Sequence, residues 1–171
     1  MNFMKRPILA IALMLLLAVP ASAQDVLKDI LKTSSAIAKD TTQNINDRKI
    51  AIFKVDELNY MKSKVTPDIL ANSKDMAFFN KKIKMLNDQS LAMKMFCDLY
   101  LKREAECKSK NKDEVKKIFK DATKANPLFD EEDEDLNNSY YNRDDYPLQF
   151  VLNCDWTKAL EQVRQVDWSK Y

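Results

Sequence analysis

Apolar residues recur every three or four positions through most of this chain, the spacing that gathers them on one face of an α-helix. Two such stretches lie in the first half of the chain, at residues 26–38 and 50–65, and the longest follows at residues 76–107. Two shorter ones occupy residues 115–126 and 156–166. The pattern therefore predicts about five amphipathic helices.

Residues that favour caps and turns place the ends of these helices. Residues 66–68, in the order threonine, proline, aspartate, predict that a separate short helix begins after the second stretch. Asn and Asp at residues 87–88 favour a bend in the longest stretch. Residues 111–114 resemble a capping box, and Asn126, which precedes a proline, should end that helix. Asp155 should cap the last helix.

The one long stretch without helical spacing is residues 128–153, which hold an acidic run, three tyrosines and a proline. Residues 149–152 fit a short extended piece, but no series of evenly spaced strands is visible. The chain contains no glycine, which tight hairpin turns favour. We therefore predict an all-α fold: a single domain, residues 24–171, built as a helical bundle or orthogonal helical array of about five helices with one long acidic and aromatic loop.

The first 23 residues have the order of a secretory signal peptide. Lys5 and Arg6 give a positive start, residues 8–19 form a short apolar core, and Ala-Ser-Ala at residues 21–23 fits a cleavage site. A retained membrane anchor is the weaker interpretation, because the apolar core is too short to span a bilayer comfortably. We expect cleavage after Ala23, export to the periplasm or the cell exterior, and a mature form without a membrane span.

Composition excludes several classes of function. The chain has no histidine, which excludes catalytic triads and other mechanisms that need imidazole. The absence of glycine excludes the glycine-rich loops that bind nucleotide phosphates. The formal charge is +2 and comes from Lys5 and Arg6, so residues 24–171 are neutral overall. A neutral domain has no long-range attraction for nucleic acid, which is therefore not an expected partner.

The spacing of acidic residues in the long loop partly matches that of a calcium-binding loop. Asp133, Asp135 and Asn137 alternate, and Asp144 stands at the twelfth position of such a loop. The match is partial, because Asn138 stands in the usual place of glycine and Asp144 is shorter than the usual glutamate. We favour a solvated or partner-binding loop with no cofactor, and keep calcium as the alternative.

Three cysteines in an exported chain leave at least one without a partner. Cys97 and Cys107 lie on one predicted helix, about 15 Å apart along its axis, which is beyond the reach of a disulfide. We expect a bridge between Cys107 and Cys154, with Cys97 reduced; three thiols that pack as small apolar groups are the alternative. A catalytic cysteine is not expected, because no histidine can lower its pKa.

Aromatic residues interleave with acids in the same loop, an arrangement common on binding surfaces. Alternatively, the rings anchor the loop to the core. The predicted contact residues are Phe129, Tyr140, Tyr141 and Tyr146.

Paired carboxylates can hydrolyse glycosidic bonds without histidine, provided that one of them is desolvated enough to donate a proton at neutral pH. Nothing in the sequence marks which carboxyl is buried, but a concave site enclosing two acids would favour such a hydrolase. The candidates are Glu131, Glu132, Glu134, Asp144 and Asp145.

Four short runs carry a resemblance to known sequences: residues 48–54, 58–61, 126–129 with the acids that follow, and 155–159. Together they resemble a family of small exported helical proteins from bacteria with Gram-negative envelopes. No activity is assigned to that family. The resemblance implies a signal peptide followed by one helical domain, and it transfers no site residues.

The sequence thus predicts an exported, non-enzymatic helical protein that binds another envelope or extracellular protein, or has a role in assembly. Its expected contact surface is the loop at residues 129–146. A small carboxylate-dependent glycan hydrolase and a calcium-stabilised module are the alternatives.

Overall fold

The computed structural model describes the backbone from Ala21 and the side chains from Val26 to the end of the chain. Residues 1–20 of the predicted signal peptide lie outside the described residues, so its cleavage stays a prediction. The described part contains six α-helices and two short 3₁₀ helices, and no strand, which confirms the all-α prediction. In chain order they are α2 (Ala21–Lys39), α3 (Ile45–Ala71), α4 (Met76–Glu106), η1 (Ser109–Asn111), α5 (Lys112–Ala125), α6 (Glu134–Asn137), α7 (Trp156–Arg164) and η2 (Trp168–Lys170).

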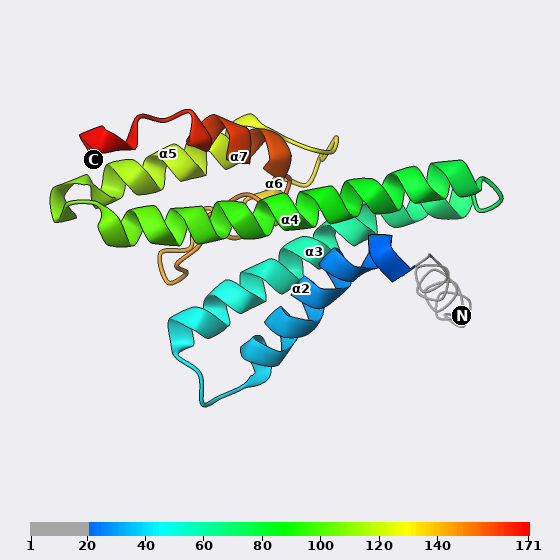
Figure 1. Ribbon diagram of the computed structural model, residues 1–171, viewed down its shortest axis with the longest axis horizontal. Helices are drawn as coiled ribbons and strands as arrows, with labels where there is room; N and C mark the ends of the chain where they lie inside the picture. The colour runs from blue at the N-terminus through cyan, green and yellow to red at the C-terminus, as the bar shows by residue number, and fades with distance from the viewer. Residues whose placement is uncertain (1–20) are drawn as a thin grey trace.

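The longest helix, α4, runs through the middle of the fold (Figure 1). Its 31 residues make it about 46 Å long. Helices α2 and α3 pack on one side of α4, and α5 and α7 pack on the other. The irregular chain between α5 and α7 crosses behind α4 in this view and joins the two sides.

Helix α3 continues past the point where the sequence predicts its end. Pro67 lies inside the helix, although its missing N–H removes one backbone hydrogen bond. Val65 and Ile69, one turn apart, are both buried and hold the two sides of the proline on one packing face. Thr66 does not cap a new helix, because its hydroxyl donates to the Lys62 carbonyl within the same one. Burial of the apolar face therefore outweighs the local stop signal.

Other end signals have mixed outcomes. Asp155 caps α7 as predicted, with its carboxylate accepting from the Lys158 N–H. The predicted capping box does not form: Asn111 makes no side-chain cap hydrogen bond, and η1 leads directly into α5. Helix α4 is continuous through Asn87, where a bend is predicted, and the Asn87 side-chain oxygen accepts from the Leu27 N–H at 3.1 Å. That hydrogen bond fastens α2 to α4.

The core is centred on Trp156, which is fully buried. Its indole ring meets the edges of Phe53 from α3, Phe96 from α4 and Phe150 from the irregular segment. Such edge-to-face aromatic pairs add about 0.5–1.5 kcal/mol each beyond the area that they bury. One aromatic cluster thus ties both sides of the fold to α4.

Candidate functional site

The four residues of the predicted calcium loop are not brought together. Asp133 caps α6 by accepting from the Leu136 N–H at 2.8 Å, and Asp135 lies within that short helix. The backbone oxygen of Asn137 accepts from the Leu152 N–H, and its side-chain oxygen accepts from the Asn153 N–H. The segment is thus a helical turn and does not wrap around an ion. In the described part of the chain, no three or more His, Cys, Asp or Glu side chains are grouped so that they could hold a metal ion.

Asn137 has a different role, because it supports an irregular segment that runs through the core. Every residue from 148 to 155 is buried. Several backbone N–H groups in this segment find partners outside it: that of Val151 donates to the Thr123 hydroxyl, and that of Asp155 donates to the Asn126 carbonyl. Buried backbone without regular structure needs such partners. Residues 149–152 are therefore part of this buried irregular chain and do not form a strand.

The predicted aromatic contact residues pack toward the core. Tyr140 is buried, donates its hydroxyl to Asp56 and meets the Phe53 ring edge-on. Burial, followed by the Asp56 carboxylate, raises the pKa of the Tyr140 hydroxyl. Phe129, Tyr141 and Tyr146 are half-buried against the same core. The rings therefore anchor the loop, as in the alternative stated above, and Tyr140 presents almost no surface to a partner.

All three cysteines are free thiols, so the expected bridge between Cys107 and Cys154 is not formed. Cys107 caps the end of α4, where its thiol lies 3.5 Å from the Glu104 carbonyl. Cys154 is buried in the core segment just before α7. Burial raises the pKa of the Cys97 thiol to about 12 and also raises that of Cys154. Both core thiols are therefore held in the unreactive protonated form.

The carboxyl group of Glu57 is fully buried in the core. Its Oε1 accepts from the Trp156 indole N–H at 2.8 Å, while Oε2 has no hydrogen-bond partner among the described residues. Burial raises the pKa of this carboxyl well above its ordinary value, an effect that the hydrogen bond from Trp156 only partly offsets. Glu57 thus matches the electrostatics of a catalytic acid. No substrate can reach it, however, because none of its surface is exposed.

The burial of Glu57 could have been predicted from the helical spacing of the sequence, although not from its charge pattern. Glu57 lies four residues after Phe53 and four before Met61, so it occupies the apolar face of its helix. An acid at such a position is predicted to be buried. The periodicity of the second stretch could therefore have identified it.

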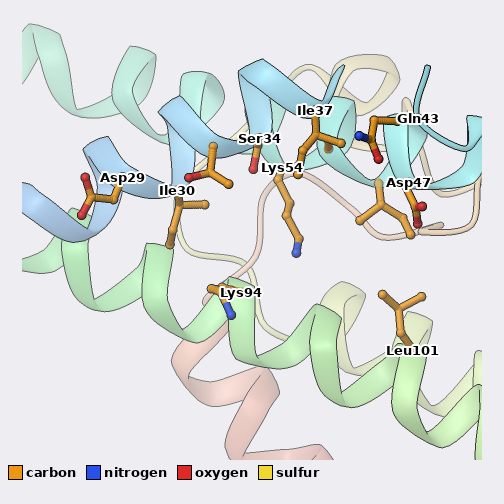
Figure 2. A pocket seen from close by; sticks show the side chains of 12 residues that line it. Asp29, Ile30, Ser34, Ile37, Gln43, Asp47, Lys54, Lys94 and Leu101 are labelled. Atoms are coloured by element: carbon orange, nitrogen blue, oxygen red, sulfur yellow. The ribbon is translucent and has the colours of Figure 1, made fainter. Parts of the chain in front are cut away.

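An open groove lies between α2, α3 and α4, with a volume of about 550 Å³. This α2 groove is within the size range of small-molecule sites, about 300–1,000 Å³. Figure 2 shows its lining side chains, which come from all three helices. The lining residues are Asp29, Ile30, Thr33, Ser34, Ile37, Gln43, Asp47, Ile50, Ala51, Lys54, Lys94 and Leu101.

Charged groups occupy distinct places in the α2 groove. Lys54 extends from α3 into the space between α2 and α4, with Lys94 of α4 nearby (Figure 2). Asp29 and Asp47 are exposed and lie toward opposite ends of the view. Asp98, just outside the groove, is 3.5 Å from the Lys54 Nζ and 2.7 Å from the Lys94 Nζ. The middle of the groove is therefore cationic, between apolar walls.

A second concavity, of about 440 Å³, is polar and contains two of the carboxylates predicted for glycan hydrolysis, Asp144 and Asp145. A hydrogen bond from Arg143, together with one from Lys49, lowers the pKa of Asp145. Glu104 also lines the cavity and is paired with Lys112 at 3.0 Å. Asp145 is therefore held as a carboxylate and cannot donate a proton at neutral pH.

The other three candidate acids lie around a separate concavity or on the exposed loop. Glu131 and Glu134 line a cavity of about 380 Å³ together with Asp130 and Phe129, whereas Glu132 is exposed. Lys64, more than any other group, lowers the pKa of Glu131. The predicted acids thus divide between two surfaces.

Comparisons with protein-family models, with curated proteins and with solved structures find no match to this chain. The resemblance to exported helical proteins therefore stays a prediction. No helix in the described part of the chain is both long enough and apolar enough to cross a bilayer.

Proposed function

We propose that this protein is an exported, non-enzymatic binding protein of the periplasm or cell exterior, and that the α2 groove is its ligand site. The observation that carries the proposal is the groove itself: an open concavity about 550 Å³ in volume with apolar walls and a polar rim. Apolar surface of this kind gains free energy when a ligand covers it, about 25 cal/mol for each Å² removed from water. The proposal replaces the aromatic loop, whose rings pack against the core, as the main contact surface.

The electrostatics favour binding over catalysis. The carboxyl best suited to donate a proton, Glu57, is sealed in the core. The carboxylate of Asp145, which a solute can reach, has a lowered pKa because of Arg143 and Lys49. The carboxyl whose raised pKa suits a proton donor, Glu57, is therefore not accessible, and the accessible carboxylate of Asp145 does not have a raised pKa.

Filling the groove should abolish binding of an apolar probe. Thr33 lines the groove from the exposed side of α2, so Thr33→Trp places an indole in the groove without disturbing the core. We expect a neutral polarity-sensitive dye to bind the native protein and to bind this variant about tenfold or more weakly. A tenfold loss is about 1.4 kcal/mol, less than the burial of one apolar side chain contributes. Dye fluorescence titration gives both affinities.

Thr41→Trp is the matched control, since Thr41 is exposed in the turn after α2 and does not line the groove. It should bind the dye as the native protein does, and both variants should keep the native helical signal in circular dichroism. Equal dye affinity in the native protein and in Thr33→Trp would remove the groove as the ligand site.

Glycan hydrolysis is the second candidate function, because the 440 Å³ concavity holds Asp144 and Asp145. Since Asp145 is kept ionised, we expect no release of reducing ends from peptidoglycan or other envelope glycans at neutral pH. The double variant Asp144→Asn with Asp145→Asn should give the same result as the native protein in a reducing-sugar assay. Hydrolysis by the native protein that the double variant loses would establish the enzyme instead.

A further inference from the structure

We propose that the ligand of the α2 groove is a single-chain amphiphile with a carboxylate head, that is, a long-chain carboxylate, and that Lys54 is the group that contacts the head. This inference rests on the proposed function and deepens it. It assigns the apolar chain to the walls of the groove and the carboxylate to its cationic middle.

Lys54 carries the argument. Only 13% of its side chain is exposed, and its ammonium group reaches into the groove (Figure 2). Among the described residues its one ion-pair partner is Asp98, at 3.5 Å, and Asp98 is held more closely by Lys94, at 2.7 Å. A cation on a largely buried side chain with only a long, shared ion pair is poorly compensated. A bound carboxylate would compensate it by a charge-assisted hydrogen bond.

The apolar walls of the groove indicate that the part of the ligand away from its head is a hydrocarbon chain. Ile30 and Ile37 of α2, Ile50 of α3 and Leu101 of α4 give the groove apolar surface from three directions. These are side chains that would cover a hydrocarbon chain. The acids of the lining, Asp29 and Asp47, are exposed and lie away from Lys54. The acid beside Lys54, Asp98, is paired with Lys94, so two ammonium groups face one carboxylate there.

The cationic groups indicate a head with one negative charge. Among the described residues the groove is lined by two lysines and no arginine, and only the Lys54 side chain is largely buried. Phosphate groups are commonly held by the bidentate fork of arginine or by several donors together. A carboxylate needs only the single charge that Lys54 supplies. The groove volume, in the lower half of the small-molecule range, suits one chain.

The experiment is a titration of the full-length mature protein with octanoate, decanoate and dodecanoate below their micelle concentrations, followed by displacement of the neutral dye. Affinity should rise about fourfold for each methylene that the groove covers, because each contributes about 0.8 kcal/mol. Dodecanol should bind about tenfold or more weakly than dodecanoate, since a hydrogen bond to a charged group is worth roughly 1.5–3 kcal/mol. Dodecyl phosphate should gain nothing over dodecanoate, and dodecyltrimethylammonium should bind most weakly.

Two variants of Lys54 separate charge from shape. Lys54→Met removes the charge but keeps a long unbranched side chain that suits a helix. It leaves Asp98 paired with Lys94, so no carboxylate loses its only partner. This variant should lower dodecanoate affinity to the level of dodecanol and leave dodecanol binding unchanged, whereas Lys54→Arg should keep the preference for the carboxylate. Lys117→Met, a change at an exposed lysine of α5, should alter neither affinity.

The possible failures are distinguishable. Equal affinities for dodecanoate and dodecanol, unchanged in Lys54→Met, would overturn the assignment of Lys54 but leave the groove as an apolar ligand site. Dye binding that no amphiphile displaces would overturn the ligand class, as would stronger binding of the cationic amphiphile or of the phosphate. Dye binding that Thr33→Trp does not weaken would overturn the proposed function itself.

Discussion

Replacement of Trp156 with alanine should destabilise the folded domain by about 3–5 kcal/mol, the usual range for removing a buried tryptophan. The ring is fully buried between α3, α4 and the irregular segment, so neighbouring side chains cannot close the cavity without losing other contacts. The same change removes the only hydrogen bond of the buried Glu57 carboxyl found among the described residues. Most small domains are stable by about 5–15 kcal/mol, so the variant should lose a large part of its stability.

Urea unfolding followed by circular dichroism measures this effect as a lower transition midpoint with an unchanged slope. Trp156→Phe keeps most of the ring and tests the hydrogen bond to Glu57, whose loss should cost about 1–3 kcal/mol. Trp168→Phe is the matched control, because that indole is only half-buried and donates to the Val163 carbonyl. An alanine variant at Trp156 within about 1 kcal/mol of the native protein would contradict the assignment of Trp156 as the centre of the core.

The helices could be predicted because their signals are local. Every helix longer than one turn shows the three-to-four residue spacing that buries one face, and Asp155 caps α7 through atoms only three residues apart. The wrong prediction at Pro67 depends on core packing, which the local stop signal does not contain. The partner of the Asn87 side chain is likewise distant, since it is the backbone of α2, sixty residues earlier in the chain.

The candidate site was harder to predict because it depends on how helices and loops that are distant in the sequence pack against one another. The α2 groove joins side chains from three helices, and nothing in the spacing of any one helix brings Lys54 toward Lys94. In the loop, the sequence could not decide whether aromatic rings would face a partner or the core. The answer depends on partners such as Asp56, which receives the Tyr140 hydrogen bond from 84 residues away.

The replacement Glu57→Gln should make the protein progressively more stable than the native form as the pH rises above about 4.5. Below that pH, Glu57 is protonated in both the folded and the unfolded states, and Gln is close to its shape. At higher pH the unfolded chain loses the proton, whereas burial keeps it on the folded protein, so folding must take up a proton. The stability of the native protein therefore falls by about 1.4 kcal/mol per pH unit from this group, until the pH passes the folded-state pKa.

The measurement is the difference in unfolding free energy between variant and native protein across the pH range, which cancels the contributions of all other titrating groups. Glu131→Gln is the control with the opposite sign. Lys64, above all, lowers the pKa of Glu131, so that carboxylate stabilises the native protein above its unfolded-state pKa and the benefit disappears as the pH falls. Glu131→Gln should thus be less stable than the native protein at neutral pH and match it in acid. A difference for Glu57→Gln that does not grow with pH would show that Glu57 is ionised in the folded core.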